Sequence, residues 1–161
     1  MKIVSLDVKK HNRKRFDCEV AALNSYLQNL ANQHSKKDSA RSYILEDEKD
    51  ESVIVGFYTL SLTSLNLPKS LEKKFSYAKS AGLIARLAVD KKYQKNGFGE
   101  WLLVDALLKL LDASEIVGFA IIVVDAKDGA KEFYKKFGFI EFFDEQDRLF
   151  ITVDSVRKSF L

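Results

Sequence analysis

The feature that most constrains this chain is a nearly unbroken apolar run over residues 117–124, Val-Gly-Phe-Ala-Ile-Ile-Val-Val. Such a run is typical of a central strand that is covered on both faces of its sheet. The flanking sequence supplies helices. Residues 98–112 predict a long helix that is apolar nearly all round, Trp101 and Leu108 included, and residues 128–137 predict a shorter one with Gly138 as its C-terminal cap.

The remaining segments predict a mixed order of strands and helices. Apolar residues at steps of three and four predict a helix that Asp17 caps and that ends near Gln33. Pro68 is expected to open a short helix in the otherwise poorly readable stretch 63–79. Strands are expected at residues 2–8, 41–45, 52–62, 82–89, 140–143 and 149–153, with a charged hairpin turn at 46–51. This order predicts an α/β (or α+β) fold with a mixed, twisted central sheet flanked by helices, in one domain over residues 1–161.

Composition removes several classes of protein. The single cysteine, Cys18, excludes an internal disulfide framework and fits a reducing cytoplasm. No apolar run approaches the ~20 residues of a membrane span, the N-terminus lacks the features of a signal peptide, and we expect no metal.

The net charge is only +3, but basic residues gather in a first cluster (Lys9, Lys10, Arg13, Lys14, Arg15) and a second cluster (Lys127, Lys131, Lys135, Lys136). Each cluster is either ordinary solvated surface or a patch that attracts phosphate-bearing partners.

The segment with the most chemical information is residues 87–99, where a strand enters a polar loop that opens a helix. The first N–H groups of a helix have no intrahelical partner, and the helix dipole adds partial positive charge there. Gly97 and Gly99 let the backbone approach a phosphate, and Lys95 adds formal charge. The segment is neither a P-loop nor a dinucleotide fingerprint, because the required Lys-Ser/Thr pair and the third glycine are absent. The pattern alone predicts an anion site or an unliganded strand–helix turn.

Two motifs in order resemble the GNAT superfamily of N-acetyltransferases. Gln94-Lys95-Asn96-Gly97-Phe98-Gly99 is similar to the family's pyrophosphate loop, Q/R-x-x-G-x-G/A, and Arg86-Leu87-Ala88-Val89 is similar to its fourth strand. One helix and one strand later, residues 130–139, Ala-Lys-Glu-Phe-Tyr-Lys-Lys-Phe-Gly-Phe, resemble its A-x-x-F-Y-x-x-x-G-F segment. The resemblance implies acetyl-CoA as the cofactor.

The resemblance also implies roles for individual residues. The backbone amides of Lys95–Gly99 would bind the pyrophosphate, and the main chain of Leu87 and Val89 would pair with the pantetheine arm. The N–H of Val89 or of a neighbour would stabilise the oxyanion, and Tyr134 would protonate the leaving thiolate. The implied cofactor-binding set is completed by Ala88, Gln94 and Phe133.

The sequence departs from the family where many members carry Asn after the fifth strand. Here Asp125 or Lys127 takes its place, or the contact is missing.

No histidine lies near the motifs, and His11 and His34 are expected at the surface. Asp90 and Glu100 are conceivable bases through water, although each is more typical of a cap or a solvated charge. An α-amine with a pKa of ~7.7–8 is partly neutral without a base, whereas a lysine amine is not.

The N-terminal half resembles a narrower group, the GNAT toxins of toxin–antitoxin pairs. The resemblance lies in Phe16-Asp17-Cys18, Leu23-Asn24-Ser25-Tyr26-Leu27, Ala31-Asn32-Gln33, Ser39-Ala40-Arg41-Ser42-Tyr43 and Ala85-Arg86-Leu87-Ala88-Val89-Asp90. These toxins block translation by acetylating the α-amine of aminoacyl-tRNA, and their partner is a ribbon–helix–helix antitoxin. The likeness makes sense of the basic clusters, since a tRNA substrate needs phosphate contacts. Such toxins are often dimers, and we expect the many Phe residues to permit a homodimer.

Two alternatives remain at this level. One is a GNAT enzyme that acetylates a small amine or a protein N-terminus, and basic patches disfavour polyamines without excluding them. The other is a non-catalytic CoA-binding module, for which loss of Tyr134 or Gly97 would have been evidence, yet both are present.

Overall fold

The computed structural model describes residues 1–67, 69–75, 77–127, 129–142 and 147–160. Its strands form a seven-stranded sheet in the order β1-β2-β3-β4-β5-β7-β6. β4 and β5 are parallel, whereas the pairs β1–β2, β2–β3, β5–β7 and β6–β7 are antiparallel. The expected mixed α/β fold is therefore confirmed. The strands are β1 (Ile3–Ser5), β2 (Arg41–Glu46), β3 (Ile54–Ser64), β4 (Ser80–Val89), β5 (Ile121–Asp125), β6 (Ile140–Glu141) and β7 (Arg148–Thr152).

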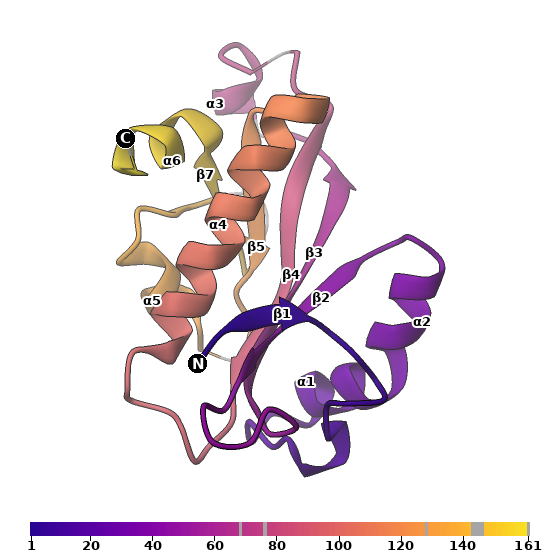
Figure 1. Cartoon of the computed structure of the whole chain (residues 1–161). Coiled ribbons are helices and arrows are strands. Elements are labelled where there is room, and N and C mark those ends of the chain that lie inside the picture. Colours follow the sequence, from indigo (N-terminus) through magenta and orange to yellow (C-terminus); the bar gives the residue numbers. More distant parts are fainter. Residues whose placement is uncertain (68, 76, 128, 143–146, 161) are drawn as a thin grey trace. The chain divides into compact units, whose positions relative to one another are not determined.

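Helices alternate with these strands along the chain (Figure 1). A 3₁₀ turn, η1, and a π-helical turn, η2, occur in the N-terminal part, and η2 joins α1 directly to α2. None of the described helices is long and apolar enough to cross a membrane. The helical elements are η1 (Arg13–Arg15), α1 (Ala21–Ser25), η2 (Tyr26–Leu30), α2 (Ala31–Lys36), α3 (Lys69–Glu72), α4 (Phe98–Val117), α5 (Lys131–Lys135) and α6 (Val153–Phe160).

The chain divides into two compact units, residues 1–61 with 85–106 and residues 62–84 with 107–161. In the first unit, α1 and η2 pack apolar side chains against strands β2, β3 and β4. The buried members of this first core are Phe16, Cys18, Tyr26, Leu27, Ala31, Ile44, Ile54, Phe57 and Ala88. In the second unit, the strands β5 and β7 supply Ile121, Val123 and Phe150 to a core that also contains Phe75, Ala81 and Phe142.

Most of the apolar run 117–124 is a central strand, β5, as predicted. All four residues from Ile121 to Val124 have an exposed fraction of 0%. The strand begins later than expected because α4 continues to Val117, and Gly118 then leaves the helix with a φ of +71°. A positive φ at the residue after a helix is the usual glycine-terminated end.

Several expectations about the helices were wrong. Asp17 does not cap α1, whose N-cap is Val20, because its carboxylate instead accepts hydrogen bonds from the Glu19 N–H and the Asn24 side chain. Trp101 and Leu108 on α4 are 40% and 39% exposed, so this helix is not covered all round. The bounds also shift: α2 reaches Lys36 and α6 was not expected. Pro68, Asp128 and Phe143, which figured in three predicted elements, lie outside the described residues.

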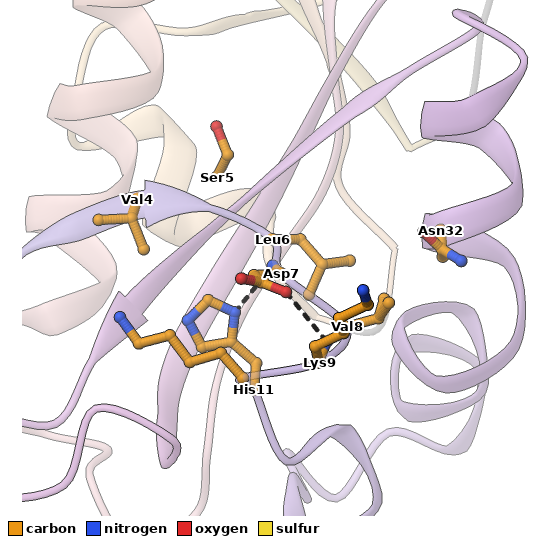
Figure 2. A pocket seen from close by; sticks show the side chains of 9 residues that line it. Val4, Ser5, Leu6, Asp7, Val8, Lys9, His11 and Asn32 are labelled. Atoms are coloured by element: carbon orange, nitrogen blue, oxygen red, sulfur yellow. Dashed lines mark hydrogen bonds between the residues drawn. The ribbon is translucent and has the colours of Figure 1, made fainter.

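The expectation that His11 lies at the surface is also wrong. Its side chain is fully buried, and Nε2 lies 2.7 Å from a carboxylate oxygen of Glu46, itself only 1% exposed. Nδ1 accepts a hydrogen bond from the Asp7 N–H at 3.0 Å, and Figure 2 shows this contact at the turn that follows β1. Since Nδ1 is an acceptor, Nε2 carries the hydrogen and donates it to Glu46. A cavity of about 570 Å³ opens beside this turn, and Lys9 and Asn32 line it.

Candidate active site

The end of β4 is fastened to the N-terminal part of the chain by Asp90. This residue is 6% exposed, and its two carboxylate oxygens accept hydrogen bonds from the N–H groups of Asp17 (3.0 Å) and Lys92 (2.9 Å). The Lys91 N–H also donates to the Asp17 carbonyl at 2.8 Å. Asp90 is therefore occupied as a backbone anchor, which fits the cap role rather than that of a base.

The predicted phosphate loop follows and is shaped by its own side chains. Lys95 and Gly97 have positive φ angles of 66° and 81°. The Gln94 side chain donates a hydrogen bond to the Val89 carbonyl at 2.9 Å, and the Asn96 side chain donates to the carbonyls of Tyr93 and Gln94, both at 3.1 Å. The amides of Gln94 and Asn96 thus hold the loop, and the backbone is left to meet a ligand.

The backbone N–H groups of this loop are unused. Among the described residues, those of Gln94, Lys95, Asn96 and Gly97 have no hydrogen-bond acceptor. The Trp101 N–H donates to the Gly97 carbonyl at 3.1 Å as the first bond of α4, so Phe98 and Gly99 precede the intrahelical bonds. A run of free N–H groups at the start of a 20-residue helix attracts an anion strongly.

The surroundings of the loop also fit a phosphate group. A Cβ placed on Gly97 would meet nothing within 4 Å, so the space in front of the backbone is open. Lys95 and Lys92 are exposed and have no ion pair within the described chain, whereas Lys91 lies 3.2 Å from Asp17. The residues present therefore suit the pyrophosphate of coenzyme A.

The strand residues predicted to contact the cofactor lie just before this loop. The parallel register of β4 with β5 covers Gly82, Leu83 and Ile84, and residues 87–89 lie beyond it. Ala88 is 6% exposed and belongs to the first core, whereas Leu87 and Val89 are half-buried.

Tyr134 and Phe133 lie on α5, in the second unit. Tyr134 is 4% exposed, and its ring makes edge contacts with Phe133 (5.1 Å between centroids) and Phe139 (5.5 Å). Its hydroxyl has no hydrogen-bond partner among the described residues. Burial, and then the charge of Asp125, raise the pKa of Tyr134 well above its usual range, so the phenol keeps its proton.

The remaining candidate groups have ordinary roles. Asp125 accepts a hydrogen bond from Arg148 Nε at 3.0 Å, and Lys127 is exposed. Glu100 is exposed in the first turn of α4. Over the part of the chain that the structure describes, no group of three or more His, Cys, Asp or Glu side chains could hold a metal ion.

The sequence reasoning missed an arrangement around Arg86 in β4. The guanidinium carbon lies 4.0 Å from the ring centroid of Tyr26, whose hydroxyl shares a 3.0 Å hydrogen bond with His34 Nδ1. His34 is thus half-buried against Tyr26 and not free at the surface. No spacing rule connects β4 with the distant helical run that holds Tyr26 and His34, although a lone Arg in an apolar strand was a usable signal.

Part of each basic cluster is neutralised locally. In the first cluster, Lys10 Nζ lies 2.8 Å from a carboxylate oxygen of Glu46 and 2.8 Å from one of Glu51. The Arg13 guanidinium donates a hydrogen bond to the Gln28 carbonyl. In the second cluster, Lys131 and Lys135 pair with Glu141. The members that are exposed and have no ion pair within the described chain are Lys9, Lys14, Arg15, Lys127 and Lys136.

The protein-family model of the acetyltransferase (GNAT) domain matches residues 17–158 of this sequence. The chain therefore belongs to the GNAT family of acetyltransferases. Among its relatives, the tRNA-acetylating toxin of Mycobacterium tuberculosis is 30% identical over 73% of this chain and 72% of the relative. The structure of AtaT complexed with acetyl-methionyl-tRNAfMet is similar at a TM-score of 0.86 and 30% identity, over 99% of both chains. A mutant AtaT toxin bound to the C-terminus of the antitoxin AtaR and acetyl-CoA has a TM-score of 0.82 and 28% identity, covering 99% of this chain and 97% of that one.

Proposed function

We propose that this protein transfers an acetyl group from acetyl-CoA to the α-amine of aminoacyl-tRNA and thereby acts as a toxin that blocks translation. The free N–H groups at the start of α4 support acetyl-CoA as the cofactor, because they form a site for its pyrophosphate. The acceptor half is supported by the likeness, along nearly the whole chain, to AtaT in complex with acetyl-methionyl-tRNAfMet.

Acetyl-CoA, when bound, supplies an acetyl thioester that an amine can attack. The chain's own contribution is to hold and orient it. Backbone N–H groups of residues 95–99 bind the pyrophosphate, and Lys95 adds charge. The main chain of Leu87 and Val89 is suited to pair with an extended arm, because both residues lie beyond the register that β4 shares with β5. The Val89 N–H, or that of a neighbour, stabilises negative charge on the reacting carbonyl oxygen.

Tyr134 holds the proton that the leaving thiolate needs. Its raised pKa keeps the phenol protonated throughout the physiological range, and its hydroxyl is not engaged by any described residue. A phenol that is neutral and uncommitted is suited to act as the general acid. Phe133 and Phe139 hold the ring at its edges.

We expect the acceptor to arrive as a neutral amine, because two candidate bases among the described residues are engaged elsewhere. Asp90 is occupied by two backbone N–H groups, and His11 is buried against Glu46. An aminoacyl α-amine, with a pKa near ~7.7–8 or lower, is neutral often enough without a base. This favours α-amines over lysine side chains.

The remaining parts of the proposal concern the setting of the reaction. We propose that both compact units belong to one catalytic domain, which works in the cytoplasm, where charged tRNA is found. By analogy with the antitoxin AtaR bound to AtaT, the inhibitor is an antitoxin, and we propose that it is of the ribbon–helix–helix type. A homodimer remains a proposal, and Phe side chains give it little support because, among the described ones, only Phe160 is exposed.

The proposal is tested with purified protein, radiolabelled acetyl-CoA and bulk charged tRNA. Label should enter charged tRNA and not the same tRNA after deacylation. Label in a small amine or a protein N-terminus, with none in charged tRNA, would overturn the acceptor assignment. Binding of acetyl-CoA without transfer to any amine would instead indicate a non-catalytic module.

A further inference from the structure

Arg86 differs from the exposed, unpaired cations of the first unit because its side chain is half-buried and its charge is still not neutralised within the described chain. The side chain is half-buried, and within the described chain its guanidinium makes no ion pair and no hydrogen bond. Its one recorded contact is with the face of the Tyr26 ring, at 4.0 Å from the centroid. An arginine that lies over an aromatic ring and has all its donors unused can bind a planar or tetrahedral oxyanion.

The position of Arg86 in β4 separates it from the cofactor loop. Side chains two residues apart lie on one face of a strand, so Arg86 shares the face of Ala88, which is buried with Tyr26 and Leu27 in the first core. Leu87 and Val89 point to the opposite face. Three residues of strand place Arg86 about 10 Å before Val89 along β4. Arg86 therefore faces α1 and η2, away from the free N–H groups that follow Val89.

Tyr26 is itself held in place. It is 3% exposed, its hydroxyl shares a 3.0 Å hydrogen bond with His34 Nδ1, and the two rings lie 5.4 Å apart. Tyr26 also begins the π-helical turn η2, and π-turns within α-helices occur frequently at functional sites. The contacts from His34 through Tyr26 to Arg86 hold the guanidinium over the Tyr26 ring, and its N–H groups have no partner among the described residues.

We propose that Arg86 binds a phosphodiester in the single-stranded 3′ end of the acceptor tRNA, with Tyr26 and His34 as positioning residues. This assignment rests on the proposed function, because it needs a nucleic-acid acceptor. Because Arg86 lies on the face of β4 opposite Leu87 and Val89, away from the N–H groups at the start of α4, we assign the anion at Arg86 to the acceptor and not to the cofactor. Arg86 thereby sets how far the aminoacyl end reaches along β4.

The test measures binding of charged tRNA, without acetyl-CoA, over a range of salt concentrations. Arg86→Met keeps the length of the side chain but removes the charge. Affinity should fall about 10- to 100-fold, and the slope of log K against log salt should become shallower by about 0.7, the value for one phosphate on a single strand. Arg157→Met, which removes an arginine paired with Asp154 at 3.6 Å, is the matched control and should leave the slope unchanged.

Further variants separate a direct contact from a structural effect. Arg86→Lys keeps the charge without the planar fork, so it should restore the salt slope but only part of the affinity. Tyr26→Phe keeps the ring beneath the guanidinium and should bind tRNA better than Tyr26→Leu, which removes it. In kinetics, Arg86→Met should raise KM for charged tRNA more than it lowers kcat, and the Kd of acetyl-CoA should change less than twofold.

Two failures can be told apart. If the wild type neither binds nor acetylates charged tRNA, the proposed function falls and the role of Arg86 falls with it. If the wild type is active and Arg86→Met retains the wild-type salt slope, only the assignment of Arg86 is overturned. A weakened Kd of acetyl-CoA in Arg86→Met would likewise overturn it, because Arg86 would then belong to the cofactor site.

Discussion

Tyr134 combines deep burial with a hydroxyl that has no described partner, which is an uncommon state for a tyrosine in a core. Tyr134→Phe should therefore leave the melting temperature nearly unchanged, since no hydrogen bond to a described residue is lost. Turnover should fall about 10²- to 10⁴-fold, the range for loss of a general acid, with the Kd of acetyl-CoA preserved. Steady-state kinetics and calorimetry check this, and unchanged turnover would remove Tyr134 from the mechanism.

The pKa of Tyr134 also predicts the form of the pH–rate profile. Because burial and Asp125 raise this pKa, the protonated form persists to higher pH than for an ordinary tyrosine. The rate with charged tRNA should rise as the α-amine loses its proton, near pH ~7.7–8 or lower. It should then stay level to about pH 10, the ordinary pKa of a phenol. A fall in kcat between about pH 8 and 9, measured on stable enzyme, would contradict this assignment.

Glu46 is a buried carboxylate whose protonation is expected to affect stability. Burial alone would raise its pKa, but hydrogen bonds from Lys10 and His11 outweigh burial, and the pKa of Glu46 is lowered. A lowered pKa stabilises the fold above the unfolded value, near ~4.3, and that contribution is lost as pH falls through the lower folded value. Glu46→Gln should cost about 1–3 kcal/mol at neutral pH.

Denaturation of Glu46→Gln from pH 7 to pH 3 checks this linkage. The gap in unfolding free energy between wild type and variant should narrow as the pH falls. Glu48→Gln, at an exposed position of the same hairpin, should match the wild type throughout. A gap that is constant with pH would show that the Glu46 carboxylate is not the group that titrates.

At the scale of elements, the start of α4 depends on Gly97. Its φ of +81° is strained for any residue with a Cβ, although nothing lies within 4 Å of that position. Gly97→Ala should cost about 1–2 kcal/mol of stability and should also weaken acetyl-CoA binding, because the added methyl enters the space in front of the free N–H groups. Gly118→Ala, with a φ of +71° and equally open surroundings at the opposite end of α4, is the matched control. It should lose similar stability in thermal denaturation and keep acetyl-CoA affinity, and equal losses of affinity would contradict the loop assignment.

The contact between β3 and β4 in the first unit depends on Gly56. A Cβ there would lie 2.8 Å from the Ala88 carbonyl oxygen and 2.7 Å from a methyl of Leu102. The leucine can turn away, but a backbone oxygen in a strand cannot. Gly56→Ala should therefore destabilise the fold by about 1–3 kcal/mol, as overpacking does, in chemical denaturation. Wild-type stability would show that β4 shifts more easily than its hydrogen bonds suggest.

The elements also show how far sequence reasoning reached. The buried run Ile121–Val124 and the start of α4 at Phe98 were predictable, because local apolar patterns determine them. The π-turn η2 was not, since steps of three and four residues fit an ordinary α-helix equally well. Helix α6 could have been predicted from Thr152, because Thr is a preferred residue at the start of a helix. Its hydroxyl accepts a hydrogen bond from the Ser155 N–H.

At the scale of the whole molecule, the predicted site residues fall in two compact units. The loop and strand residues 87–99 lie in the first, and Phe133 and Tyr134 lie in the second. Motif resemblance found both groups, because each motif is local. The burial of His11 against Glu46 and the stacking of Arg86 on Tyr26 were missed, since both depend on contacts between residues far apart in the sequence.

The proposed function requires the α-amine of aminoacyl-tRNA to be the acceptor. Mass spectrometry of the aminoacyl-adenosine released by nuclease, after charged tRNA is incubated with protein and acetyl-CoA, tests it most directly. We expect a product heavier by one acetyl group on the α-nitrogen, and loss of that product with Tyr134→Phe. Unmodified aminoacyl-adenosine, from wild-type protein that acetylates another amine in the same mixture, would contradict it.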